Sequence, residues 1–314
     1  MNYASTKPKA GVVNRPSRAK KIMRGVLRDW RLYLLLAPAV IYILLFSYQP
    51  MYGVQIAFRK FRPSKGIWGS QWVGMKYFID FFEHPLFWKL IWNTMRISLY
   101  SMCTFPLPII LALLINELDS EKFKKTVQMI TYAPHFLSTV VVCSMLTLFC
   151  SKDNGLFNHI IAFFGGTRTS LLENPALFTP LYVWSGVWQG IGWSSILYIA
   201  ALSGVSPELI EAARIDGANE WKILTRIKLP LMSPIIGFVI MMGMIGCFQA
   251  FTEVDIMTQG GPNNATILMV NYIYNQAFGN AKMGRGAAAS VLLFAVIFVL
   301  TLIQKIMKDR KEAE

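Results

Sequence analysis

The sequence predicts an all-α polytopic membrane protein with six transmembrane helices. Of its 314 residues, 54% are apolar and only 15% are charged, well below the quarter usual in soluble domains. About 20 mostly apolar residues cross the hydrocarbon core of a bilayer as a helix. Six runs reach that length, at approximately residues 32–51, 91–115, 130–150, 178–203, 231–251 and 287–307. Transmembrane β-strands would instead alternate over ten-residue segments, so the helical fold is favoured.

The net charge of +14 is spread unevenly. Nine lysines and arginines precede the first span, and the positive-inside rule then places both termini in the cytoplasm. The first outer segment departs from the rule with Arg59, Lys60, Arg62 and Lys65. Basicity here indicates topology, and no basic stripe with interleaved aromatic residues favours a nucleic-acid partner. We predict a basic cytoplasmic tail at 1–30, lying on the inner leaflet, and a transmembrane domain at 31–314.

Proline and aromatic residues predict details within this plan. Pro106 and Pro108 should kink the second span, because proline cannot donate a backbone hydrogen bond. The outer segment after the first span is rich in Trp, Phe and Tyr, which favour the membrane–water interface. We expect it to fold along the surface, and we expect a short interfacial helix within 267–278.

A polar segment at 206–230, SPELIEAARIDGANEWKILTRIKLP, separates the fourth and fifth spans. Ser206 followed by Pro207 predicts a helix start, because serine caps helices and proline is tolerated at the first helical position. Gly217 stands where a left-handed residue would end the helix. The pattern predicts a short cytoplasmic helix at 207–216, with Ala212 and Ala213 offering a bare patch to another surface.

The same segment resembles a known family. Glu211-Ala212-Ala213, Gly217, Ile227 and Leu229-Pro230 have the spacing of the EAA loop in membrane subunits of binding-protein-dependent ABC importers. IDGA at 215–218, IMTQGGP at 256–262 and YIYNQAF at 272–278 are similar to the carbohydrate-uptake branch. WRLYLLLAPAV, PMYGVQIAF and TYAPHF extend the resemblance to its oligosaccharide and polysaccharide permeases.

The resemblance implies a type I importer permease in a bacterial cytoplasmic membrane. Implied partners are a second, similar permease, two cytoplasmic ATPases that bind ATP and Mg, and an extracytoplasmic solute-binding protein that delivers sugar. The segment 206–230 would be the coupling loop that docks on the ATPase. Its implied coupling residues are Glu211, Ala212, Ala213, Asp216 and Gly217. No phosphate-binding loop, G-x-x-x-x-G-K-[ST], occurs in the chain, so by this route it is not itself the ATPase.

A substrate path is predicted along the fourth span. Gly186, Gln189, Gly190 and Trp193 recur at three and four residues and so share a helix face. An amide and an aromatic ring suit sugar hydroxyls and C–H faces, with Trp188 flanking. Phe248, Gln249 and Phe251 are further candidates at the end of the fifth span. Close helix packing and interfacial anchoring remain alternatives for small residues and tryptophan.

Other functions fit the sequence less well. An intramembrane serine protease would need Ser185 within hydrogen-bond reach of His135 or His159. The three histidines lack carboxylate clustering, so no catalytic or metal site is predicted. A secondary transporter working alone would need membrane-embedded acids, and the spans hold essentially none before Glu253. An ABC importer permease for a non-sugar solute remains open.

Overall fold

The structure, a computed structural model, describes residues 28–261 and 264–313. They fall into two units, one ending at Val54 and one beginning at Gln55, and each is described by itself. The predicted membrane-bound tail at 1–30 lies almost wholly outside the described residues, as do Pro262 and Asn263 of the predicted turn.

From Trp30 to its end at Val54, the first unit is an apolar helical run. α2 (Trp30–Ile43) continues into the π-helical turn η1 (Leu44–Tyr48), and η2 (Gln49–Phe58) follows. The first predicted span is therefore helical. No residue of α2 or η1 is buried within the chain, so this apolar run requires lipid or another subunit around it.

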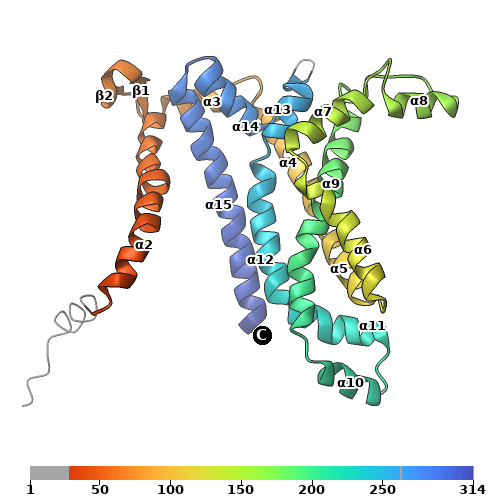
Figure 1. The fold of residues 1–314 in the computed structure, drawn as a ribbon. Helices are drawn as coiled ribbons and strands as arrows, with labels where there is room; N and C mark the ends of the chain where they lie inside the picture. Colours follow the sequence, from red (N-terminus) through yellow and green to blue (C-terminus); the bar gives the residue numbers. More distant parts are fainter. Residues whose placement is uncertain (1–27, 262–263, 314) are drawn as a thin grey trace, which may run out of the picture. The chain divides into compact units, whose positions relative to one another are not determined.

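The second unit holds a small hairpin and a bundle of helices (Figure 1). Its elements before the fourth predicted span are β1 (Arg59–Arg62), η3 (Pro63–Lys65), β2 (Gly66–Trp72), α3 (Lys76–Phe82), α4 (Phe87–Cys103), α5 (Pro106–Asn116), α6 (Glu121–Tyr132), η4 (Ala133–Phe136), α7 (Thr139–Phe149) and α8 (Leu156–Phe163). The later elements are α9 (Pro175–Ser203), α10 (Pro207–Ile215), α11 (Glu220–Ile223), η5 (Leu224–Lys228), α12 (Leu229–Phe248), α13 (Thr252–Thr258), α14 (Met269–Tyr274), η7 (Asn275–Gly279) and α15 (Met283–Ala313).

Four helices in the described residues are long and apolar enough to cross a membrane. They span Trp30–Phe58, Phe87–Asn116, Glu220–Thr258 and Met283–Arg310. Two further helix pairs pass the same test together but are bent, which brings the number to at most six. The helical class is confirmed, and six spans is the upper limit of what the helices allow.

The third predicted span, 130–150, is not one straight helix. The stretch Glu121–Phe136 meets Thr139–Phe149 at an angle of 92°. Leu137 and Ser138 adopt extended backbone angles at the corner, so the helical hydrogen-bond ladder stops there. Pro134, His135 and Ser138 mark this corner in the sequence, but the long apolar stretches on both sides led to the expectation of one continuous span. The second span shows the predicted interruption, because α4 ends at Cys103 and α5 begins at Pro106.

The aromatic outer segment contains a two-stranded antiparallel hairpin that the sequence analysis did not predict. β1 pairs with β2 through Arg59 opposite Trp72 and Lys60 opposite Gln71. The guanidinium of Arg59 lies over the rings of Trp68 and Trp72, at 5.5 and 5.4 Å. The predicted short helix within 267–278 is present as α14 and η7.

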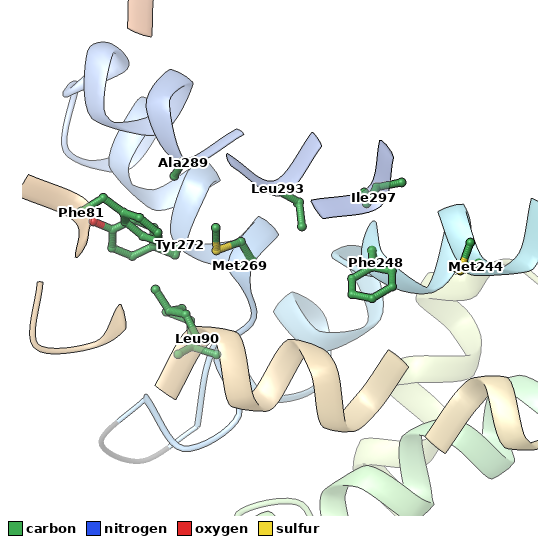
Figure 2. Close-up of a cluster of buried hydrophobic side chains, with 10 residues drawn as sticks. Phe81, Leu90, Met244, Phe248, Met269, Tyr272, Ala289, Leu293 and Ile297 are labelled. Atoms are coloured by element: carbon green, nitrogen blue, oxygen red, sulfur yellow. The ribbon is translucent and has the colours of Figure 1, made fainter. Parts of the chain in front are cut away.

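Separate apolar clusters hold the bundle together. One joins α3, α4, α12, α14 and α15, and Figure 2 shows Phe81 against Tyr272, with Leu90, Met269 and Phe248 also in the cluster. The rings of Phe81 and Tyr272 lie 5.5 Å apart. Another cluster packs α5, α9 and α12 around the buried Tyr198 and Met232. These contacts fix α9 and α12, the helices that flank the 206–230 segment.

Within the second unit, α10 and α11 lie at the same end as the C-terminus (Figure 1). The side chain of Gln304 donates to the carbonyl of Gly237 at 3.5 Å, which places the last part of α15 beside α12. The 206–230 segment and the end of α15 thus share one end of the bundle.

Candidate functional site

The short helix predicted at 207–216 is α10, Pro207–Ile215. Ser206 occupies the N-cap position, although its hydroxyl makes no capping hydrogen bond. Gly217 has φ +78°, a left-handed angle that glycine adopts without strain. The amide of Gly217 donates to the carbonyl of Arg214 at 3.1 Å, and that of Ala218 to Ala213 at 2.9 Å. These two bonds form a Schellman motif, so the end of α10 is sharply defined.

α10 buries no residue in this chain. Glu211, Ala212, Asp216 and Gly217 are exposed, and Ala213 is half-buried. Ile215 is 87% exposed and Trp221, in α11, is 69% exposed. Exposed apolar side chains of this size are typical of surfaces that contact another protein or a membrane. The predicted coupling residues thus lie in one short helix and its C-terminal cap, and all of them except Ala213 are exposed.

An ion pair joins α10 to the next helix. The guanidinium of Arg214 contacts the carboxylate of Glu220 at 2.8 Å, with both side chains exposed. Asn219 caps α11 by accepting a hydrogen bond from the amide of Lys222 at 2.9 Å. From Glu220 the helix runs through η5 into α12 without a break. α10 is thereby attached to the base of a membrane-length helix.

A second ion pair lies where this helix enters the bundle. The ammonium of Lys228 hydrogen-bonds the carboxylate of Glu117, which directly follows α5. That hydrogen bond, assisted by the lysine's charge, holds the pKa of the Glu117 carboxyl below its usual value. Sequence analysis missed both residues. The only local indication in the sequence was Lys228, directly before the apolar run that begins at Leu229.

A cavity of about 260 Å³ lies beside α9. Its polar lining comes from α4 with its C-cap, from α9 and from α13: Ser101, Thr104, Tyr182, Ser185, Gln189, Ser194 and Glu253. The side-chain amide of Gln189 donates to the carbonyl of Leu137 at 2.9 Å, at the corner between η4 and α7. The cavity therefore offers hydroxyls, an amide and a carboxylate between apolar walls, which suits a hydroxyl-rich ligand.

The glycines of α9 differ in their surroundings: one packs closely against another helix, and two face open space. A Cβ on Gly192 would lie 2.1 Å from the carbonyl oxygen of Thr131, so α6 packs against α9 there. A Cβ on Gly186 or Gly190 would meet nothing within 4 Å, and both glycines line the cavity. Close helix packing within this chain therefore accounts for Gly192 and does not account for Gly186 or Gly190.

The aromatic candidates lie at different places around the bundle. Trp193 stacks on His135, with ring centres 4.5 Å apart and planes 7° apart. Trp188 lines a neighbouring, almost wholly apolar cavity of about 720 Å³ between α7, α8 and α9. Of the residues predicted on this face of α9, Gly186, Gln189 and Gly190 line the polar cavity, whereas Trp188 and Trp193 do not.

The candidates near the end of α12 are also separated. Phe248 is buried in the cluster of Figure 2, and Gln249 lines a cavity of about 560 Å³ between α12, α14 and α15. The ring of Phe251 lies 5.0 Å from that of Tyr274.

The residues considered for a protease do not meet. The hydroxyl of Ser185 donates to the carbonyl of Tyr182 at 2.8 Å, His135 stacks on Trp193, and His159 contacts Arg168 at 3.3 Å.

Asn93, buried in α4, donates to the carbonyls of Ala265 and Ile267 and so fixes the backbone there. Asn93 thus has a structural role in this chain.

Comparison with known proteins agrees with this architecture. Residues 104–312 match the family described as the binding-protein-dependent transport system inner membrane component. The polygalacturonan/rhamnogalacturonan transport system permease protein YteP of Bacillus subtilis (strain 168) is 35% identical over 294 residues, covering 93% of this chain and 92% of YteP. Protein LplB of the same organism is 39% identical over 281 residues, covering 88% of each chain.

Solved structures with the same fold include a bacterial ABC transporter involved in import of the acidic polysaccharide alginate. That chain has a TM-score of 0.84 and 33% identity, and the match covers 92% of this chain and 99% of the other. A second structure, with an alginate pentasaccharide-bound periplasmic protein, has a TM-score of 0.83. The fold and the exposed helical segment thus define a permease-type membrane subunit of a transport complex. The chain belongs to the family of binding-protein-dependent transport system inner membrane components.

Proposed function

We propose that this chain is the permease subunit of an ATP-driven ABC importer that takes up a carbohydrate, in the form of an oligosaccharide. The observation that carries the proposal is the capped and exposed helix α10, with the complete EAA spacing, in a chain of the inner-membrane-component family. Similarity to YteP and to a subunit of the alginate importer supports a carbohydrate substrate.

The proposed assembly pairs this chain with a second, similar permease above two cytoplasmic ATPases. ATP and Mg would be bound by those ATPases, and an extracytoplasmic solute-binding protein would deliver the sugar. The six spans would cross a bacterial cytoplasmic membrane with both termini inside. The structure containing a periplasmic protein with its alginate pentasaccharide supports the last of these partners by similarity.

In this assembly α10 would dock on the ATPase through Glu211, Ala212, Ala213, Asp216 and Gly217. Small alanine side chains permit close approach of another backbone, and the exposed Ile215 supplies apolar area to bury. Because α10 is capped at Gly217 and tied to α11 by Arg214, it would move as one piece.

The sugar would pass along the face of α9 that carries Gly186, Gln189 and Gly190. The open space beside the two glycines and the polar lining of the cavity support this path. Trp193 and Trp188 flank it on neighbouring turns of α9, and Phe248, Gln249 and Phe251 would contribute near the end of α12.

The proposal is tested by reconstituting this chain together with the transport proteins encoded by neighbouring genes. We expect ATP-dependent uptake of oligosaccharides into liposomes only when the solute-binding protein is present. A panel of acidic and neutral oligosaccharides would identify the substrate, and uptake of none of them would rule out the carbohydrate assignment.

Docking has its own test. Ala212→Cys should form a disulfide with an engineered cysteine in the ATPase groove. The control is Lys305→Cys, an exposed position in the C-terminal part of α15, which lies at the same end of the bundle as α10. A cross-link at 305 without one at 212 would overturn the proposed role of α10.

A further inference from the structure

Lys228 is a nearly buried cation with a carboxylate partner far away in the sequence. Its side chain is 9% exposed, whereas that of Glu117 is 52% exposed. The two residues lie 111 positions apart. A lysine is rarely buried this deeply unless it is paired. The position of Lys228 therefore depends on the end of α5.

The pair joins two helices at their ends. Glu117 directly follows the last turn of α5, and Lys228 ends η5 at the base of α12. The C-terminal end of a helix carries partial negative charge, so the ammonium is also favoured by the exposed carbonyls of α5. This contact links the 206–230 segment to α5 by charge as well as by packing.

The turn that carries Lys228 has an unusual geometry. η5 is a π-helical turn, Leu224–Lys228, and Pro230 follows within the first turn of α12. A proline clashes with the carbonyl four residues earlier in a regular α-helix. The wider π turn removes that clash, and such turns are frequent at functional sites. One extra residue in a turn rotates the following helix face by roughly 100°, so η5 sets the direction of Lys228.

The other end of α5 borders the polar cavity. Phe105 and Pro108, at the start of α5, line it together with Thr104. α5 also packs against α9, whose residues line the same cavity. A shift of the C-terminal end of α5 would therefore be felt at the cavity, because a helix of 11 residues moves largely as a rigid body.

We propose that Lys228 and Glu117 form a positioning pair that carries the movement of the coupling segment to α5 and thus to the cavity. This inference rests on the proposed function. Two ion pairs in series then connect α10 to the cavity wall, Arg214–Glu220 at the surface and Lys228–Glu117 at the bundle. Spatial continuity alone does not establish coupling, so the pair needs a direct test.

The test uses the complete reconstituted transporter, with uptake and ATP hydrolysis measured together. We expect Lys228→Met and Glu117→Gln each to lower the number of sugars imported per ATP hydrolysed by at least about fivefold, the lower range of typical coupling between sites. Matched controls are Lys305→Met and Glu121→Gln, exposed residues in the described helices α15 and α6, which should keep the wild-type ratio.

A charge exchange separates the pair from local packing. The double variant E117K/K228E keeps one charge of each sign and should recover at least half of the lost ratio. A double variant no better than the single ones overturns the inference. If Lys228→Met does not assemble, Glu117→Gln decides, because that exposed and equal-sized change leaves the packing intact.

The cross-link at Ala212 distinguishes the two levels of failure. A normal cross-link with wild-type coupling ratios in both single variants overturns the positioning pair and leaves the docking of α10 standing. If the Ala212→Cys chain forms no cross-link when Lys228 and Glu117 are both unchanged, the docking of α10 itself is overturned.

Discussion

The indole of Trp193 stacks on the imidazole of His135, joining the middle of α9 to the turn before α7. The ring of Phe136 meets the same indole edge-on at 6.1 Å. Trp193 nevertheless remains 48% exposed, so one part of the ring packs while another faces open space. Packing and contact with a ligand are compatible at this residue.

We expect Trp193→Ala to lower uptake while the complex still assembles. The ring is about half exposed, so its removal should cost less than the roughly 3–5 kcal/mol of truncating a fully buried aromatic residue. Uptake and the yield of intact complex are measured on the same preparation, with His135→Ala as the companion variant. If Trp193→Ala abolishes assembly, the ring is a packing residue and its contact with sugar is disproved.

Gly192 and Gly190 offer a matched pair on one helix. Gly192→Ala should disrupt the complex, because its Cβ would overlap the backbone of Thr131 at 2.1 Å. Gly190→Ala should leave thermal stability unchanged or slightly higher, because its Cβ would have open space and alanine favours the helix by about 1 kcal/mol. Thermal unfolding of the two purified complexes checks both expectations. Equal stabilities would contradict the close approach of α6 to α9.

Gly217→Ala should lower sugar uptake, because it distorts the C-terminal end of α10. The left-handed angle at Gly217 costs an ordinary L-residue roughly 1–2 kcal/mol, whereas asparagine tolerates it better. We therefore expect Gly217→Asn to retain much more uptake than Gly217→Ala, at equal levels of assembled complex. Equal loss in both variants would show that the side chain obstructs docking and that backbone strain is not the cause.

The Lys228–Glu117 pair should be insensitive to pH over the physiological range. The pKa of Glu117 is lowered in the folded protein, so the pair is fully formed above the ordinary carboxyl value of 4.5. Its contribution is lost only as the pH falls through the lowered folded value. The coupling ratio of the wild type relative to Glu117→Gln should then stay constant from about pH 5 to pH 8. If the wild-type coupling ratio fell to that of Glu117→Gln near pH 6, Glu117 would not be ionised there and the prediction would be wrong.

Features encoded by neighbouring residues were predictable from the sequence. Pro207 and Gly217 mark the ends of α10 within one or two residues, because caps depend on local backbone chemistry. The break at Pro106 follows from the missing N–H of proline. Apolar runs identified the membrane-length helices, since the bilayer sets their length.

Features that depend on distant partners were not predictable in this way. The corner at Leu137 is held in part by Gln189, 52 residues later, a contact that the local residues do not reveal even though Pro134 and Ser138 lie beside the corner. The hairpin β1–β2 was predicted only as a surface loop, although Pro63 and Gly66 mark its turn. The partnership of Glu117 with Lys228 joins two segments whose proximity is created by the fold. The separation of Gln189, Trp188 and Trp193 into different surroundings likewise depends on α6 and α7.

The bare isoleucine at the tip of α10 has a consequence for biogenesis. If α10 docks on an ATPase as proposed, copies of this chain made in excess of that ATPase would leave Ile215 and Trp221 exposed, and these side chains would promote self-association. We therefore expect such orphan copies to be cleared by membrane proteases unless both gene products are synthesised in balance, so that docking would also enforce the stoichiometry of the transporter.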